Sequence, residues 1–219
     1  MQLLWAIRRK WDSLFWSHYR FRIPRRVLPP VLVRPLKNED VATCHEIYRL
    51  NEPTHFPPGY FEHFSQALTN GKTLFMVVEE KGKVLGFAGI CMHTEPAQNS
   101  VGLTFGMVHP DAQRRGIGTV LLLARLAVLP IPRSGYILYM SPIANSQPFF
   151  RQFGFGFVRH FWDHKTCIIM DSFSLIIRQA GLRQCRDKLK ISNVMLETDL
   201  KIPVVGVVKG EDGLFRPVD

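Results

Sequence analysis

The chain has 219 residues, of which 46% are hydrophobic and 21% are charged, and its formal net charge at pH 7 is +10. This length and composition suit one domain with extensions, and no stretch approaches the roughly 18 uninterrupted apolar residues of a membrane-spanning helix. The four cysteines are widely spaced, which argues against a zinc site and against a disulfide-rich secreted scaffold.

The first thirty residues hold seven basic residues against one acidic residue, and therefore most of the excess charge. Apolar side chains recur there at helical intervals, at Leu4, Ile7, Trp11, Leu14 and Phe15. This pattern predicts an amphipathic helix that docks on the protein or a second subunit, lies on a membrane surface, or acts as a mitochondrial targeting segment. We expect a cytoplasmic protein in which residues 1–30 form a basic extension able to reach a membrane.

The rest of the chain predicts alternating strands and helices. In chain order, these are a strand at 31–36, a helix at 38–50, a proline- and aromatic-rich loop at 51–60, a short helix at 60–69, hairpin strands at 73–80 and 84–94, a strand at 101–108, a buried helix at 117–129, a strand at 134–142, a short helix at 146–154, paired strands at 156–161 and 165–173, a basic helix at 174–190, and a strand at 201–208 before a loose tail. This order predicts a mixed α/β (α+β) fold with a mostly antiparallel central sheet flanked by helices.

A glycine-rich loop joins the strand at 101–108 to the buried helix. Gly116 and Gly118 allow a tight turn and a close approach of another surface, directly at the start of a helix whose first N–H groups lack helical partners. Together with Arg114 and Arg115, this combination predicts a phosphate site. A dinucleotide-binding loop is excluded because the position of its third glycine is Leu121.

The loop and its surroundings carry a resemblance to a known family. Gln113-Arg114-Arg115-Gly116-Ile117-Gly118 matches the pattern Q/R-x-x-G-x-G/A of the GCN5-related N-acetyltransferases, the GNAT superfamily. Val108-His109-Pro110 before the loop and the aromatic-glycine segment at 149–155 resemble the flanking motifs of that family. The resemblance covers roughly residues 31–172 and leaves 173–219 as a C-terminal extension of helix and strand.

The resemblance implies an acyl-CoA-dependent N-acyltransferase that uses acetyl-CoA and no metal. The backbone near Met107 and Val108 would bind the pantetheine arm beside a bulge at Gly106. The diphosphate would be held by the loop, and Asn145 would also contact CoA. The loop residues implied are Gln113, Arg114, Arg115, Gly116, Ile117, Gly118 and Thr119.

Acetyl transfer needs a base for the amine and a way for the thiolate to leave. Base candidates are His93, Glu95 and His109. The family often places a tyrosine that protonates the thiolate four residues before the glycine of its closing motif, but here that residue is Phe150. Water alone, or a hydroxyl of Tyr139 or Ser141, would then assist the thiolate, or the site would turn over poorly.

The acceptor amine is a small molecule or a protein amine, contacted by Glu52, His55, Phe56 and Tyr60 from the proline-rich loop. Residues 174–219 would offer a homodimer contact. A second hypothesis is a CoA-binding, weakly catalytic or non-catalytic regulatory protein attached to a membrane surface. Nucleic-acid binding is disfavoured, because the excess charge lies in one terminal segment and no nucleic-acid motif is present.

Overall fold

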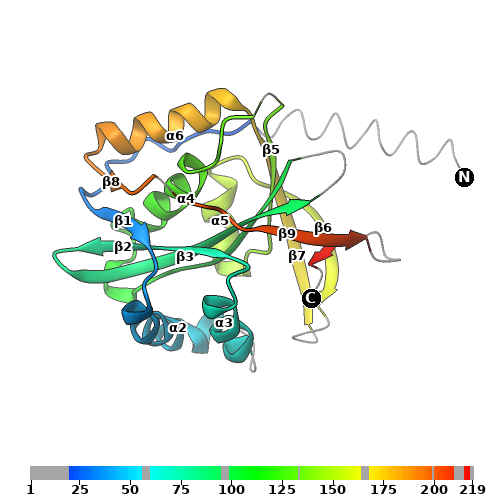
Figure 1. Ribbon diagram of the computed structural model, residues 1–219, viewed down its shortest axis with the longest axis horizontal. Helices are drawn as coiled ribbons and strands as arrows, with labels where there is room; N and C mark the ends of the chain where they lie inside the picture. Colours follow the sequence, from blue (N-terminus) through cyan, green and yellow to red (C-terminus); the bar gives the residue numbers. More distant parts are fainter. Residues whose placement is uncertain are drawn as a thin grey trace, which may run out of the picture.

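The computed structural model describes residues 20–55, 60–94, 99–132, 134–163, 168–198, 200–209 and 215–217. The amphipathic helix expected in the first residues therefore lies outside the described residues, as do Phe56 and Glu95. Within these ranges the chain forms a mixed sheet with helices on both faces (Figure 1). The fold class expected from the sequence is confirmed.

The sheet is built from a long meander with additions at its edges. Its strands are β1 (Leu32–Pro35), β2 (Leu74–Glu80), β3 (Lys83–Thr94), β4 (Ser100–Val108), β5 (Tyr136–Met140), β6 (Gly156–Asp163), β7 (Ile168–Ile177), β8 (Met195–Leu196), β9 (Val204–Lys209) and β10 (Phe215–Pro217). Their order is β6-β7-β5-β4-β3-β2-β1-β8, with β9 paired to β3 and β10 to β9. Three pairs are parallel, β1 with β8, β3 with β9 and β4 with β5, and the others are antiparallel.

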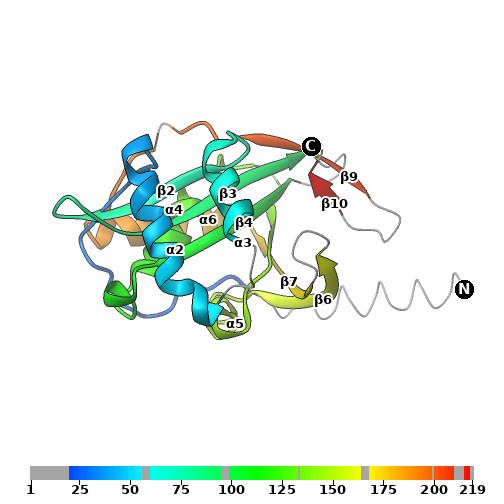
Figure 2. The same ribbon diagram turned by 90° about the horizontal axis from the view of Figure 1, so that it is seen from below.

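The helices cover the two faces of the sheet in separate groups (Figures 1 and 2). They are α2 (Val41–His55), α3 (Tyr60–Thr69), α4 (Ile117–Ala127), α5 (Gln147–Arg151) and α6 (Gln179–Ile191), with short 3-10 helices η1 (Asn38–Asp40), η2 (Pro110–Ala112) and η3 (Ala144–Ser146). One face carries α2 and α3, and the other carries α4, with α6 packed against α4. The helix α4 is buried nearly all round, as its apolar sequence predicts.

Several element boundaries differ from the sequence prediction. The helix α2 continues to His55, through half of the segment expected to be a loop, and β7 extends to Ile177, where a helix was expected. In the C-terminal region, β8 and β9 join the central sheet, and β10 replaces part of the expected loose tail. The strands β8 and β9 pair with β1 and β3, which lie far away in the sequence, so a local pattern cannot reveal these pairings.

The central feature of the sheet is an opening between β4 and β5. The two parallel strands pair only over Ser100–Gly102 and Ile137–Tyr139, after which β4 continues to Val108 without a partner on this side. On its other side, β4 carries a bulge against β3, because Phe87 pairs with Met107 whereas Gly89 pairs with Thr104. The bulge expected at Gly106 is therefore present, and it lies beside the opening.

A buried ion pair fixes the first strand to the helix that follows it. The Arg34 guanidinium donates to both carboxylate oxygens of Asp40, at 2.6 and 2.9 Å, and to Glu79 at 2.8 Å. The hydrogen bond from Arg34 and the backbone N–H of Lys37 hold the pKa of the Asp40 carboxyl below its usual value, against the effect of burial.

We expect Asp40→Asn to lower the free energy of unfolding by about 2–3 kcal/mol, less than an isolated buried pair would lose because Glu79 still faces Arg34. Since the pKa of Asp40 is lowered by folding, this contribution is complete above about pH 4 and declines as the pH falls below that value. Urea denaturation at several pH values measures it. Glu39→Gln, at an exposed carboxylate, serves as the control and should change stability by less than about 1 kcal/mol.

Candidate functional site

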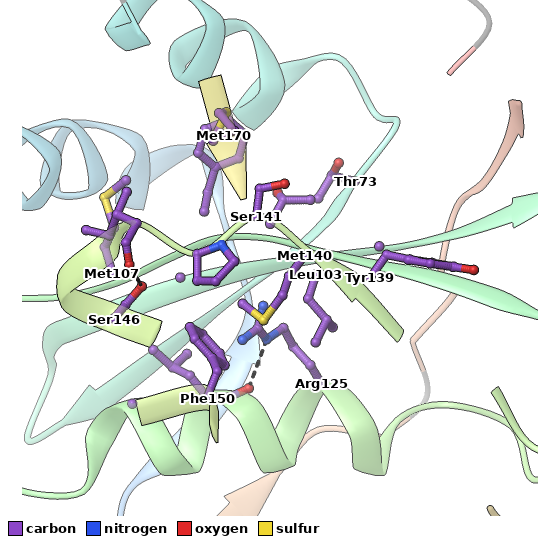
Figure 3. Close-up of a pocket in the computed structure, with 18 of the residues that line it drawn as sticks. Thr73, Leu103, Met107, Arg125, Tyr139, Met140, Ser141, Ser146, Phe150 and Met170 are labelled. Atoms are coloured by element: carbon purple, nitrogen blue, oxygen red, sulfur yellow. Dashed lines mark hydrogen bonds between the residues drawn. The ribbon is translucent and has the colours of Figure 1, made fainter. Parts of the chain in front are cut away.

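The opening between β4 and β5 leads into a cleft of about 1840 Å³ (Figure 3). Its walls combine residues 102–108 of β4, residues 139–146 after the start of β5, the glycine-rich loop, and the side chains of α3, α4 and α5 that reach the opening. The volume exceeds that of an ordinary small-ligand site, so the cleft has room for an extended ligand together with a second molecule.

The glycine-rich loop sits at one end of this cleft with its backbone in a strained turn. Gly116 precedes the first residue of α4 and has φ +95°, while Arg114 has φ +59°. A side chain at Gly116 would also meet Pro29 at 3.3 Å. The turn therefore requires glycine at this position.

The start of α4 offers hydrogen-bond donors without protein acceptors. The first helical bond runs from Val120 N–H to the carbonyl of Gly116. Within the described part of the chain, the N–H groups of Ile117, Gly118 and Thr119 form no hydrogen bond. Gly118 and Thr119 line the cleft, so these donors and the positive end of the helix dipole lie at the cleft, an arrangement that suits an anion.

The loop is tied to the end of β4 by two amide side chains. Gln113 Nε2 donates to Asn51 Oδ1 at 3.2 Å and to the carbonyl of Val108 at 3.3 Å. Asn51 is buried and donates to the carbonyls of Ile47 and Val108, at 2.7 and 3.2 Å. Asn51 was not predicted as a site residue, because only the fold brings the end of α2 beside this loop.

The two loop arginines point in different directions. Arg114 lines the cleft, whereas Nη2 of Arg115 donates to both carboxylate oxygens of Glu80, at 2.7 and 2.8 Å. Arg115 and His109 line a separate, smaller hollow of about 350 Å³. Of the two predicted arginines, only Arg114 therefore lines the cleft.

A segment before the domain adds another cation. Residues 20–30 run beside the loop, where Arg26 lines the cleft and donates to the carbonyl of Arg114. Arg22 donates to the carbonyl of Gln152 at 2.9 Å, which anchors the same segment beside α5. The basic run before residue 30 was predicted as part of an extension, and its place beside the glycine-rich loop became visible only in the fold.

The predicted catalytic candidates gather on the cleft, with some exceptions. Tyr139, Ser141, Asn145 and the buried Phe150 all line it, on and after β5. His93 lines it from the end of β3, and its Nε2 is 3.4 Å from the sulfur of Cys91. Burial lowers the pKa of His93 and so favours a neutral imidazole.

The predicted acceptor contacts are only partly on the cleft. Tyr60 lines it together with His63, at 5.6 Å between ring centroids, and burial raises the pKa of Tyr60 to about 12. Glu52 is not among the residues that line the cleft, and the side chain of His55 lies outside the described residues.

Arg125 is a further polar residue of the cleft that was not predicted as a site residue. It is the one charged residue of α4, and its side chain reaches the cleft from below the sheet (Figure 3). The sequence could have pointed to Arg125, because it is a single arginine within an otherwise apolar helix.

A splayed sheet with a glycine-rich anion site at its opening defines a class of protein that binds an extended, phosphate-bearing ligand between two strands. The profile of the Acetyltransferase (GNAT) family matches residues 41–155, which is more than half of the chain. The chain belongs to this family and is a GNAT-type acetyltransferase.

Solved structures agree with this assignment of the fold. A GNAT-family acetyltransferase from Desulfovibrio desulfuricans is similar with a TM-score of 0.54 and 17% identity, over 67% of this chain and 98% of that one. A ribosomal-protein-alanine N-acetyltransferase from Brucella melitensis is similar with a TM-score of 0.50 and 19% identity, over 66% of this chain and 99% of that one. No curated protein matches the sequence.

None of the described helices has the length and apolar character needed to cross a membrane. In the described part of the chain, no group of three or more His, Cys, Asp or Glu side chains could hold a metal ion.

We expect Gly116→Ala to lower the free energy of unfolding by about 1–2 kcal/mol, because the new side chain must adopt a left-handed backbone conformation and contacts Pro29. Gly118→Ala is the matched control, since its side chain would make only ordinary van der Waals contacts, with Phe149 at 3.6 Å and Val108 at 3.9 Å. The stability of this variant should equal or exceed that of the native protein. Urea denaturation of both variants gives the comparison. Equal loss in the two variants would contradict the role of the turn.

Proposed function

We propose that the protein is an acyl-CoA-dependent N-acyltransferase, which transfers acetyl from acetyl-CoA to a primary amine by direct attack in a ternary complex. The observation that carries this proposal is the set of unbonded N–H groups at the start of α4, at the end of the free edge of β4. The family to which the chain belongs uses acetyl-CoA as its donor, and an anionic diphosphate suits these donors.

The donor would be held along the cleft by backbone groups and two cations. The loop from Gln113 to Thr119 would cradle the diphosphate, with the Arg114 and Arg26 side chains beside it. The backbone of β4 near Met107 and the N–H of Val108, whose carbonyl is already bonded to Asn51 and Gln113, would hydrogen-bond the pantetheine arm. Asn145 also lines the cleft and would contact the arm. Arg115 is already paired with Glu80 and would contribute only its backbone.

The chemistry would require a neutral amine and a polarised thioester carbonyl. A backbone N–H at the β4 bulge would donate to that carbonyl, as in an oxyanion hole. His93 would accept the proton of the amine, directly or through water, because its imidazole lies on the cleft and is kept neutral by burial. Glu95 remains a second candidate for this proton.

The acceptor would approach from the side of α3. Tyr60 and His63 form an aromatic wall there, and Phe105 lies 5.7 Å from the Tyr60 ring. The amine would belong to a small molecule or to a protein, and the segment containing His55 and Phe56 would complete the acceptor site.

The second candidate function is a CoA-binding regulatory protein with weak or no catalysis. The observation that favours it is Phe150, which has no proton to give the leaving thiolate. In that case residues 1–30 would attach the protein to a membrane surface, and residues 174–219 would support a homodimer. Free thiol release with a panel of amines, measured for the native protein and for Gly116→Trp, separates the two candidates. Release from the native protein alone supports the enzyme, whereas CoA binding without release supports the regulator.

We expect Arg26→Ala to weaken CoA binding about tenfold, because it removes a charged donor beside the anion site. Arg115→Ala is the matched control and should keep the affinity within about twofold, since that side chain is held by Glu80. Isothermal titration calorimetry with CoA measures both. If no heat is detected with CoA or acetyl-CoA for the native protein, the proposed function is wrong.

The pH dependence of kcat/KM tests His93 as the base. Because the amine must be neutral, the rate should rise about tenfold per pH unit below pH 10, and about a hundredfold per unit below the pKa of His93, which burial places under its usual value of about 6.5. In His93→Gln the steeper segment should disappear and the rate should fall by roughly 10²-fold or more. Cys91→Ala, which keeps the imidazole, is the control and should retain the steeper segment. An unchanged profile in His93→Gln would exclude His93.

A further inference from the structure

Arg125 presents an unpaired guanidinium nitrogen to the cleft. Its side chain is only 3% exposed, yet it lines the cleft (Figure 3). Its Nε donates to the carbonyl of Leu121 at 3.2 Å and its Nη1 to the carbonyl of Gly89 at 3.1 Å. Its Nη2 has no hydrogen-bond partner among the described residues, so two of the three nitrogens position the third.

The charge of this guanidinium is not neutralised by the protein. No carboxylate of the described residues lies within ion-pair distance of Arg125, in contrast to Arg34 and Arg115. Burial lowers the pKa of Arg125 to about 9, which still leaves it protonated at pH 7. The guanidinium lies in the last turn of α4, where the negative end of the helix dipole favours a cation. This position and the two carbonyl acceptors partly offset the cost of removing the charge from water. A buried cation that lacks an anion and faces a cleft indicates that a ligand supplies the negative charge.

The guanidinium lies under the β4 bulge, where the proposed reaction would take place. Gly89, whose carbonyl Arg125 binds, is the residue at which the β3–β4 register shifts. A side chain at Gly106 would lie 3.6 Å from Nη2, so the absence of one leaves the charge open to the cleft. Phe150 lines the same part of the cleft and offers no polar group (Figure 3).

We propose that Arg125 stabilises the negative charge that develops on the sulfur of the donor, and so replaces electrostatically the acid that Phe150 cannot provide. This inference rests on the proposed function. In the step concerned, the amine nitrogen forms a bond to the thioester carbon, the carbon–sulfur bond breaks, and its electron pair remains on sulfur as thiolate. The amine proton passes to His93 or water, Arg125 keeps its own protons, and water later protonates the thiolate.

The ionisation of CoA bound to the protein tests this proposal without knowledge of the acceptor. The ultraviolet absorbance of the thiolate, followed against pH, reports the ratio of thiolate to thiol in bound and free CoA. We expect that ratio to be at least tenfold larger in the bound state at a given pH, and to return toward the free value in Arg125→Met. Arg125→Lys, which keeps the charge, should restore part of the effect.

Two further variants separate the charge from a structural role. Gly106→Ala keeps Arg125 and places a methyl group between Nη2 and the cleft, so it should reduce the thiolate ratio even if Arg125→Met proves unstable. Arg186→Met is the matched control, because Arg186 also donates to main-chain carbonyls near the end of α4, of Ala127 and Leu129 at 2.8 and 2.7 Å, but does not line the cleft. It should leave the ratio unchanged.

The remaining outcomes distinguish an error in the role of Arg125 from an error in the proposed function. CoA that binds with the same thiol ionisation as free CoA overturns the role of Arg125 and leaves the proposed function intact, whereas absence of CoA binding overturns the proposed function itself. The proposal is also overturned if a donor with a terminal carboxylate, such as succinyl-CoA, is used more than tenfold better than acetyl-CoA and Arg125→Met reverses that preference. In that case the guanidinium would bind the acyl group instead of the sulfur.

Discussion

The separation of β4 from β5 after three residue pairs is the constraint on which the rest of the structure depends. A strand that loses its neighbour leaves a row of N–H and C=O groups without partners, and a closed core cannot accommodate such a row. Here the edge opens into a cleft, the strand ends at the glycine-rich loop, and α4 starts directly from that loop. The edge of β4 that has lost its neighbour and the unbonded N–H groups at the start of α4 therefore lie on the same cleft.

The arginines near this surface fall into two groups, those paired with a carboxylate and those without one. Arg34 and Arg115 are each neutralised by a carboxylate and hold elements of the fold together. Arg26 and Arg125 reach the cleft and meet no carboxylate within ion-pair distance in the described residues. The first lies beside the glycine-rich loop and the second beneath the bulge. The two cations are thus located at the ends of the path that an acyl-CoA would follow, one at its phosphates and one at its thioester.

The sequence predicted those parts of the site that are encoded locally. The glycine-rich loop, the strand before it and the bulge at Gly106 all lie within one short stretch, so their chemistry can be inferred from residue types and spacing. Asn51 and Arg26 could not be predicted, because each reaches the loop from an element distant in the sequence. The same limit applies to β8 and β9, whose partners β1 and β3 lie far earlier in the chain.

Arg125 shows a different limit of prediction from sequence. The residue itself stands out in the sequence, but its surroundings in the fold do not. One arginine in an apolar helix indicates either a rim position or a buried cation, and the helical period alone does not distinguish them. The fold decides in favour of burial, because α4 is enclosed between the sheet and α6. Phe150, which has no hydroxyl, and the Arg125 cation line the same part of the cleft, so both determine the electrostatic environment there. An apolar wall lowers the local dielectric, which strengthens the attraction between the guanidinium and a developing thiolate. Phenylalanine at position 150 is on this view compatible with catalysis, because it excludes water from the place where the fixed charge acts.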